Sequence, residues 1–240
     1  MQESEYLTTL HALQQAAWPQ GAPTAPVYPL GEQPLTRYLQ HWAQSQPEKT
    51  AIHFYGHQLS YAELEDLSNR FAALLYQQGI KPGDRVAVFM PNCPQLHIAF
   101  YGILKAGAIH APVSPMAKGI ELSYQLNDSG AIALVCFDQL MPVVREVKAE
   151  TGLQVVISTS LSELCPAAPP IPVPDLLQAP KLPITDSIDL LPALLGLAPA
   201  ANLPELQLDD IAALNYTGGT TGLPKGCIHT HGDMLYTCAS

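Results

Sequence analysis

The strongest pattern of apolar and polar positions lies between Ser60 and Gly79. Its apolar residues recur at the three- and four-residue spacing of one helix face: Leu64, Leu67, Phe71, Leu74 and Leu75. Ser60 and Glu63 form a capping-box pattern at the start, and Gly79 stands where a C-terminal cap belongs. The spacing therefore predicts a helix between Ser60 and Gly79, with its apolar face in the core.

Strand-like and helical segments alternate around this helix. A turn at Gly56 separates two short strand-like runs upstream. Further short apolar runs lie at 86–90, 131–136 and 154–158, and helical segments lie at 95–105 and 139–150. Such alternation is typical of a parallel sheet covered by helices. It predicts an α/β fold over about residues 60–160, with a doubly wound, mostly parallel sheet and flanking helices.

Two proline-dense segments interrupt the pattern. Residues 1–34 are predicted to form an extended leader, because five prolines fall between residues 16 and 34. Ten prolines between Pro166 and Pro204 exclude long regular structure there. We expect residues 166–204 to cross the surface, with one short helix at 188–195.

The segment 216–226, YTGGTTGLPKG, follows a short apolar strand at 211–214. Its glycines permit positive φ and close approach of the backbone: Gly218, Gly219, Gly222 and Gly226. Hydroxyl donors are added by Thr217, Thr220 and Thr221. Lys225 is the one Lys or Arg after Lys181. Backbone amides, hydroxyls and one ammonium group are suited to phosphate oxygens, so the sequence predicts a phosphate-binding loop, with a helix resuming near Gly232.

The overall composition changes this picture little. The chain has 240 residues, of which 48% are hydrophobic and 13% charged, which is enough for a packed core. Its net charge is -10 and it has no basic cluster, which argues against nucleic acid or an anionic membrane as a partner. Any bound anion must therefore be held by local donors.

The cysteines and the apolar runs indicate the compartment. The five cysteines are widely and irregularly spaced, which suggests neither a disulfide framework nor a CxxC site. The N-terminus lacks a signal-peptide pattern, and no run of 18 apolar residues occurs. We therefore expect a cytoplasmic protein without a transmembrane segment.

The glycine-rich segment has two other interpretations. One is a flexible turn without a ligand. The other is a Walker loop, which requires GxxxxGK followed by Ser or Thr, whereas here Pro224 precedes Lys225 and Gly226 follows it. At about 4 Å and an effective dielectric constant near 20, one lysine attracts one phosphate charge by roughly 4 kcal/mol. Exposed charges beyond about 8 Å are largely screened, so the local lysine outweighs the net charge.

The segment YTGGTTGLPKG resembles the phosphate-binding signature of the adenylate-forming enzymes. These include acyl-CoA synthetases, luciferases and the adenylation domains of peptide synthetases. Two weaker patterns occur upstream in the family's order: LSYAELEDLSNRFAALL from Leu59, and LKAGAIHAPVSP from Leu104. The resemblance covers about residues 30–240. It implies that residues 35–240 are the N-terminal part of an AMP-binding domain.

The resemblance also implies roles for the loop residues. Thr217 to Gly222 would wrap the β- and γ-phosphates of ATP, Thr217 would lie near Mg²⁺, and Lys225 would neutralise the departing pyrophosphate. A carboxylate would form an acyl-adenylate, and a thiol, that of coenzyme A, would then displace AMP. The commonest family form has serine where this chain has Gly218. Glycine at this position is similar to the form of the motif in fatty-acid CoA ligases, and it favours a fatty or other apolar acid as the substrate.

The family's chain continues beyond the segments matched here. Its downstream motifs contact adenine and ribose, and its C-terminal domain supplies a second lysine; none has a match in this sequence. We therefore expect the N-terminal part of a larger enzyme, lacking the C-terminal domain and inactive alone. Two alternatives remain open: an adenylation enzyme that loads a carrier-protein thiol, and a nucleotide-binding module without catalysis.

Residues just after the loop have simpler interpretations. His229 and His231 form an HxH pair, but two ligands do not make a zinc site, and we expect no metal there. Cys227 could be reactive beside Lys225, yet we expect it to be buried as a small apolar residue.

Residues just before the loop also have alternative interpretations. Tyr216 fits either a contact with nucleotide or a core aromatic at a strand end. Asp209 and Asp210 are adjacent, so in an extended chain they point to opposite faces. A shared catalytic role is therefore disfavoured, and we expect them to begin the strand.

Overall fold

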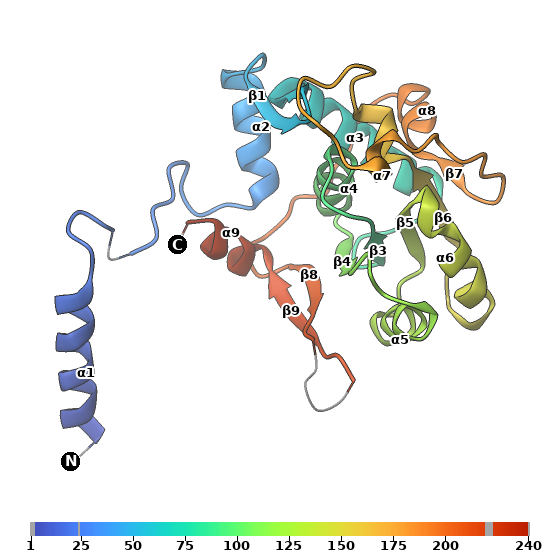
Figure 1. Ribbon diagram of the computed structural model, residues 1–240. Coiled ribbons are helices and arrows are strands. Elements are labelled where there is room, and N and C mark those ends of the chain that lie inside the picture. The colour runs from blue at the N-terminus through green and yellow to red at the C-terminus, as the bar shows by residue number, and fades with distance from the viewer. Residues whose placement is uncertain (1–2, 24, 219–222, 240) are drawn as a thin grey trace.

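The computed structural model describes residues 3–23, 25–218 and 223–239, and its body is a sheet with helices on both faces (Figure 1). The helices are α1 (Glu3–Ala17), α2 (Leu35–Ser45), α3 (Tyr61–Gln77), α4 (Pro94–Lys105), α5 (Gly119–Ser129), α6 (Met141–Val147), α7 (Asp175–Gln178), α8 (Leu190–Leu195) and α9 (His231–Ala239). The strands are β1 (Thr50–Phe54), β2 (His57–Ser60), β3 (Arg85–Phe89), β4 (Ile109–Val113), β5 (Ala133–Phe137), β6 (Val155–Thr159), β7 (Ile188–Asp189), β8 (Ile211–Tyr216) and β9 (Gly226–Thr230). Short 3-10 turns lie at Asp138–Leu140, Lys148–Glu150 and Leu161–Leu164.

The main sheet has the strand order β7-β6-β5-β3-β4-β8-β9, while β1 and β2 form a separate hairpin. All neighbouring pairs in the main sheet are parallel except β8 and β9. From β3 the chain moves to β4 on one side, and then crosses back to β5 on the other. The predicted doubly wound, mostly parallel sheet is therefore confirmed.

Alternation along β3 explains why helices cover both faces of this sheet. Successive side chains of a strand point to opposite faces. Val86 and Val88 pack in the cluster that includes α3, α4 and α8. Ala87 and Phe89 pack in the cluster that includes α5 and α6. Burying a side chain the size of Val or Phe contributes about 1.5–3 kcal/mol, so this almost wholly apolar strand is stable only between two helical layers.

The helix α3 forms as its pattern predicts. Glu63 N donates to Ser60 Oγ at 3.2 Å, and Ser60 N donates to Glu63 Oε2 at 2.8 Å, which completes the capping box. Phe71 and Leu75 are fully buried. Gly79 has a φ of 82°, a conformation that glycine adopts without strain.

A buried polar cluster joins α3 to α4. Lys105 Nζ lies 2.6 Å from Glu65 Oε2 and also donates to Ser68 Oγ at 2.7 Å and Asn69 Oδ1 at 2.9 Å. Burial lowers the pKa of Lys105, and the Glu65 carboxylate opposes this shift. Because its donors are all engaged within the cluster, this lysine holds the two helices together.

The proline-dense segment 166–204 leads from the β6 side of the sheet towards β8. It contains the short elements α7, β7 and α8, and it returns the chain from the β7 edge to β8 beside β4. Ala200 N donates to Asn69 O at 3.2 Å, and Arg70 Nη1 donates to Leu197 O, so the crossing is fastened to α3.

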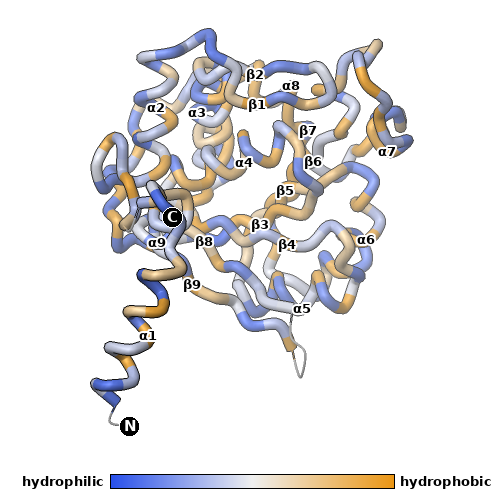
Figure 2. The backbone as a smooth tube through the Cα atoms, turned by 60° about the vertical axis from the view of Figure 1, so that its left-hand side comes forward, coloured by the Kyte–Doolittle hydropathy of each residue, from blue (hydrophilic) through white to orange (hydrophobic). Residues whose placement is uncertain are grey.

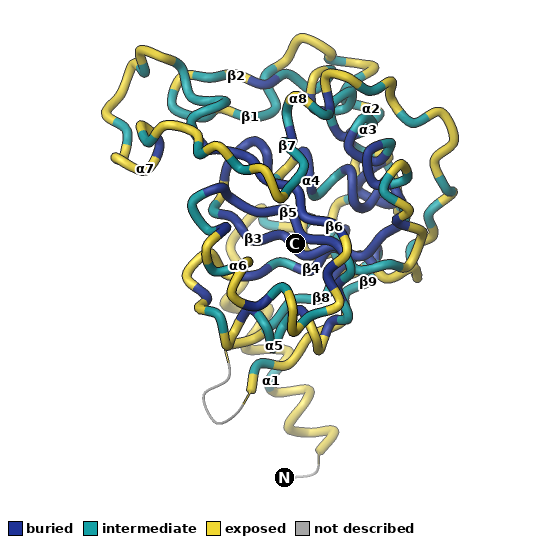
Figure 3. Tube along the Cα trace, turned by 90° about the vertical axis from the view of Figure 1, so that its right-hand side faces the viewer, coloured by how far each residue is buried: buried dark blue, intermediate teal, exposed yellow. Residues whose placement is uncertain are grey.

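The prediction of an extended leader over residues 1–34 was wrong for the segment that forms α1. Residues 3–17 contain neither proline nor glycine, so nothing in them prevents a helix, and the prolines begin only at Pro19. None of the α1 residues is buried, and the helix stands apart from the body (Figures 1 and 3). Figure 2 shows that α1 mixes hydrophilic and hydrophobic residues, while the central strands are hydrophobic.

Candidate functional site

The glycine-rich segment connects β8 and β9, which form an antiparallel hairpin at the edge of the sheet (Figure 1). Tyr216 pairs with Gly226, and Thr217 N donates to Lys225 O at 3.1 Å. These contacts close the base of the loop. The strand β8 was predicted, but β9 was not, because a short strand that begins with glycine and stays largely exposed has little apolar signal.

The direction of β8 places the loop at one edge of the sheet. His110 of β4 is the register partner of Ala213, and the two strands are parallel. The chain therefore leaves β8 at the edge where the parallel strands have their carboxyl ends. Open α/β sheets bind their ligands outside this edge.

The described part of the loop is open to solvent. Thr217, Gly218 and Lys225 are exposed. Among the described residues other than its chain neighbours, no atom lies within 4 Å of a Cβ built on Gly218. Among the described residues, no carboxylate lies within 4.0 Å of Lys225 Nζ. The predicted binding residues Gly219, Thr220, Thr221 and Gly222 lie outside the described residues.

The helix α5 contacts both ends of the loop. Tyr216 donates its hydroxyl to Asp128 Oδ2 at 2.6 Å, and Tyr124 donates its hydroxyl to Pro224 O at 2.8 Å. Burial raises the pKa of the Tyr216 phenol, and the hydrogen bond to Asp128 raises it further, so Tyr216 is a donor at neutral pH. Tyr216 is thus half-buried against α5 and is not a core aromatic.

Sequence reasoning missed α5 and these contacts. Tyr124 and Asp128 are separated from their partners by 100 and 88 residues, a distance at which local patterns carry no information. The only available signal was their i, i+4 spacing, which places two polar side chains on one helix face.

The histidine and aspartate residues beside the loop lie on β9, at the start of α9 and just before β8. The described residues contain no group of three His, Cys, Asp or Glu side chains that could hold a metal ion. His231 is buried at the start of α9, where its backbone N donates to Asp210 O at 3.0 Å. Asp209 and Asp210 lie in the turn directly before β8 and do not, as had been expected, begin the strand, because β8 starts only at Ile211.

Cys227 corrects another expectation. It was expected to be buried, but it is exposed, as is its neighbour Ile228. The reason is topological, because β9 is an edge strand whose one partner among the described strands is β8. The described part of the chain packs no helix over these two side chains.

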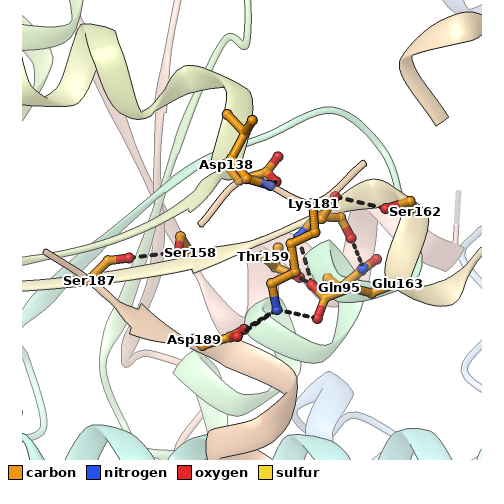
Figure 4. A network of polar contacts seen from close by, with 11 residues as sticks. Gln95, Asp138, Ser158, Thr159, Ser162, Glu163, Lys181, Ser187 and Asp189 are labelled. Carbon is orange, nitrogen blue, oxygen red and sulfur yellow. Dashed lines mark hydrogen bonds and ion pairs between the residues drawn. The ribbon is translucent and has the colours of Figure 1, made fainter. Parts of the chain in front are cut away.

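A second polar network lies at the carboxyl ends of β5 and β6 (Figure 4). Lys181, from the proline-dense crossing, lies 2.7 Å from Glu163 Oε1 and 2.5 Å from Asp189 Oδ1. Nearby, the fully buried Gln95 donates Nε2 to Ser160 O at 2.8 Å. These contacts fasten the crossing to the sheet. Since the lysine is already paired twice, we assign the network a structural role.

With the fold and the loop in place, comparison with known proteins defines the class. Residues 39–240 match the family described as AMP-binding enzyme. This match covers most of the chain, and the chain belongs to that family. The resemblance to adenylate-forming enzymes is therefore confirmed.

Among curated proteins, the chain is similar to long-chain-fatty-acid–CoA ligases. It is 36% identical over 214 residues to the ligase of Bacillus subtilis (strain 168), a match covering 86% of this chain and 38% of that protein. It is 40% identical over 187 residues to the ligase of Escherichia coli O6:H1, covering 75% of this chain and 33% of that protein. The chain thus spans less than two fifths of the length of these relatives.

Solved structures share the fold. The anthranilate CoA ligase AuaEII in complex with anthranoyl-AMP matches with a TM-score of 0.72 at 21% identity, covering 86% of this chain and 36% of that one. The N-terminal domain of FACL13 from Mycobacterium tuberculosis matches with a TM-score of 0.59 at 30% identity, covering 82% and 44%. In the described part of the chain, no helix is both long and apolar enough to cross a membrane.

Proposed function

We propose that this chain is part of an ATP-dependent acyl-CoA synthetase that activates a fatty acid. A carboxylate oxygen attacks the α-phosphorus of ATP, and the bond from that phosphorus to the departing pyrophosphate breaks. The thiol of coenzyme A then attacks the acyl carbon of the acyl-adenylate, and AMP leaves. The names of the curated relatives support a long-chain acid, and Gly218 supports the same class through the resemblance to fatty-acid CoA ligases.

The observation that carries this proposal is the exposed Lys225, which has no carboxylate partner among the described residues and lies on a glycine-rich hairpin at the carboxyl edge of the sheet. We assign Lys225 to the charge that develops on the departing pyrophosphate. One lysine and one phosphate charge at about 4 Å attract by roughly 4 kcal/mol at an effective dielectric constant near 20. Exposure reduces this figure, since surface charges are screened by water and salt.

The remaining donors of the loop position the substrate. We assign Thr217 through Gly222 to the β- and γ-phosphates, with backbone amides as the principal donors. Such donors lower the barrier by orienting the reacting groups and stabilising charge in the transition state. The reaction requires no covalent nucleophile from the protein.

The loop also fits a magnesium ion that is bound chiefly by ATP. Mg²⁺ takes oxygen ligands and is often held by few protein groups together with substrate phosphates. The hydroxyl of Thr217, an exposed residue, is the oxygen that we assign to the ion, because the described residues offer no cluster of carboxylates. When bound, the ion would neutralise part of the negative charge on the phosphates.

We also propose that these 240 residues alone do not complete the reaction and release no pyrophosphate. The support is that the chain covers 38% of the Bacillus subtilis ligase, so most of such an enzyme lies outside it. The compartment proposed for the whole enzyme is the cytoplasm.

Isothermal titration of ATP and AMP tests the role of Lys225. The Lys225→Ala variant should bind ATP about tenfold more weakly, which corresponds to about 1.4 kcal/mol, while AMP binding changes little. The reason is that AMP lacks the β- and γ-phosphates that we assign to the loop.

Lys81→Ala is the matched control. Lys81 is also exposed, but it precedes β3 at the amino edge of the sheet. This variant should bind both nucleotides as the wild type does. Equal losses of ATP and AMP affinity in Lys225→Ala would contradict the proposal.

A further inference from the structure

We propose that Tyr124 and Asp128 of α5 are positioning residues that hold both ends of the β8–β9 loop in the geometry that binds phosphate. The effect on ATP rests on the proposed function, whereas the restraint on the hairpin does not. Both residues lie outside the signature at 216–226, about 90 to 100 residues upstream of it.

The two hydrogen bonds reach the loop from opposite ends. On the β8 side, Asp128 Oδ2 accepts the hydroxyl of Tyr216 at 2.6 Å. On the β9 side, the hydroxyl of Tyr124 donates to Pro224 O at 2.8 Å. Tyr124 and Asp128 are four residues apart, so they share one face of the helix. A single helix face therefore fixes both ends of the loop.

The last glycine of the signature makes room for this arrangement. A Cβ at position 226 would lie 3.1 Å from Cζ of Tyr216 and 3.3 Å from its hydroxyl oxygen. Both distances are tighter than ordinary contact. A larger residue at Gly226 would therefore push the phenol away from Asp128, so the space at position 226 and the hydrogen bond to α5 depend on each other.

The helix that carries both residues is itself firmly placed. Leu122 and Leu126 of α5 are buried in the cluster that also contains Phe89 of β3. Apolar packing thus sets α5 on the core, and its outward-facing Tyr124 and Asp128 transmit that position to the hairpin.

Holding the ends of the β8–β9 loop matters because a glycine-rich backbone loses more conformational freedom than other segments do when a ligand orders it. Thr217 and Gly218 are exposed, and among the described residues beyond its chain neighbours no atom would lie within 4 Å of a Cβ on Gly218, so the described side chains pack little against this part of the loop. Holding the ends in advance reduces the entropy that phosphate binding must still remove. Breaking the bonds to α5 should weaken binding without removing any group that touches phosphate.

Hydrogen exchange of the Thr217 amide measures the restraint directly, without nucleotide. This amide donates to Lys225 O and closes the base of the loop. In Tyr124→Phe and in Asp128→Ala, we expect it to exchange about tenfold faster than in the wild type. The amide of Val135 in β5 should be unchanged, which shows that the fold is intact.

Tyr6→Phe is the matched control for loss of a phenolic hydroxyl, because Tyr6 lies on α1, apart from the loop (Figure 1). It should leave Thr217 exchange unchanged. Tyr216→Phe removes the same hydrogen bond as Asp128→Ala, but from the side of its donor. The Thr217 amide should therefore exchange no faster in the Tyr216→Phe/Asp128→Ala double variant than in either single variant. Unchanged Thr217 exchange in Tyr124→Phe, Asp128→Ala and Tyr216→Phe would overturn the proposal.

Titration of the same variants with ATP and AMP separates this proposal from the proposed function. We expect ATP affinity to fall about three- to tenfold in Tyr124→Phe and Asp128→Ala, with AMP affinity unchanged. Faster exchange with unchanged ATP affinity would overturn the positioning role. If the wild type itself binds no ATP while exchange responds as expected, the proposed function fails and the restraint on the hairpin stands.

Discussion

At the residue scale, pairing distinguishes Lys225 from the lysines that hold the fold together. Lys105 and Lys181 each lie within 2.7 Å of a carboxylate oxygen, and each joins separate elements. A lysine in such a pair must give up that partner before it can bind a phosphate. Lys225 has no carboxylate within 4.0 Å among the described residues, so its charge is available to a ligand.

His110 provides a prediction for the dependence of stability on pH. It is buried in β4 beside the ring of Phe100, and burial lowers its pKa from 6.5 to about 4. Below pH 6.5 the unfolded chain takes up a proton that the folded chain takes up only near pH 4. Folding stability is therefore lost as pH falls between these values, by on the order of 2 kcal/mol from pH 7 to pH 5.

Urea unfolding at several pH values checks this contribution. His110→Leu keeps a side chain of similar size and removes the titrating group, so the variant should lose less stability than the wild type between pH 7 and pH 5. The carboxylates titrate in both proteins, so their contribution to the pH dependence of stability cancels in the comparison. The same loss in both proteins would show that His110 does not contribute.

At the element scale, the contact of α3 with α4 depends on Gly102. A Cβ there would lie 2.6 Å from a ring carbon of Phe71 and 2.9 Å from the backbone oxygen of Ser68. Because backbone cannot move aside without shifting the helix, Gly102→Ala should destabilise the fold by about 1–3 kcal/mol in urea unfolding.

Gly152→Ala is the control for the cost of the methyl group. At Gly152 the nearest atom to an added Cβ is Ala131 O at 3.9 Å, an ordinary contact. We expect this substitution to be nearly neutral. A similarly small effect at Gly102 would mean that the two helices are not packed as tightly as described.

Elements with strong local signals were predictable from the sequence, and those without them were not. α3 has a capping box and a regular apolar face, and β3, β5 and β6 are apolar runs between turns. The strand β4 contains Pro112 and the polar His110, which obscure its pattern. It forms because its neighbours β3 and β8 supply the pairing.

The candidate site divides in the same way. Thr217 and Lys225 could be selected because they lie within one contiguous signature. Tyr124 and Asp128 could not, because they reach the loop only after the sheet has placed α5 beside it. Contacts across about 100 residues arise from topology, which no local pattern encodes.

At the scale of the whole molecule, the chain order brings the loop and its support together. The sheet grows from β3 in both directions, and the proline-dense crossing then returns the chain to pair β8 with β4. This return places the hairpin at the carboxyl edge and against α5. The crossing therefore decides where the loop lies. A chain that added its next strand beside β7 would place the loop at the other end of the strand order.

The most direct test of the central claim is to locate ATP by NMR. Adding ATP to the labelled chain should shift the amide signals of Thr217, Gly218 and Lys225, and pyrophosphate should shift the same signals while AMP affects them less. Saturable ATP binding that leaves these three amides unshifted would contradict the claim that this loop holds the phosphates.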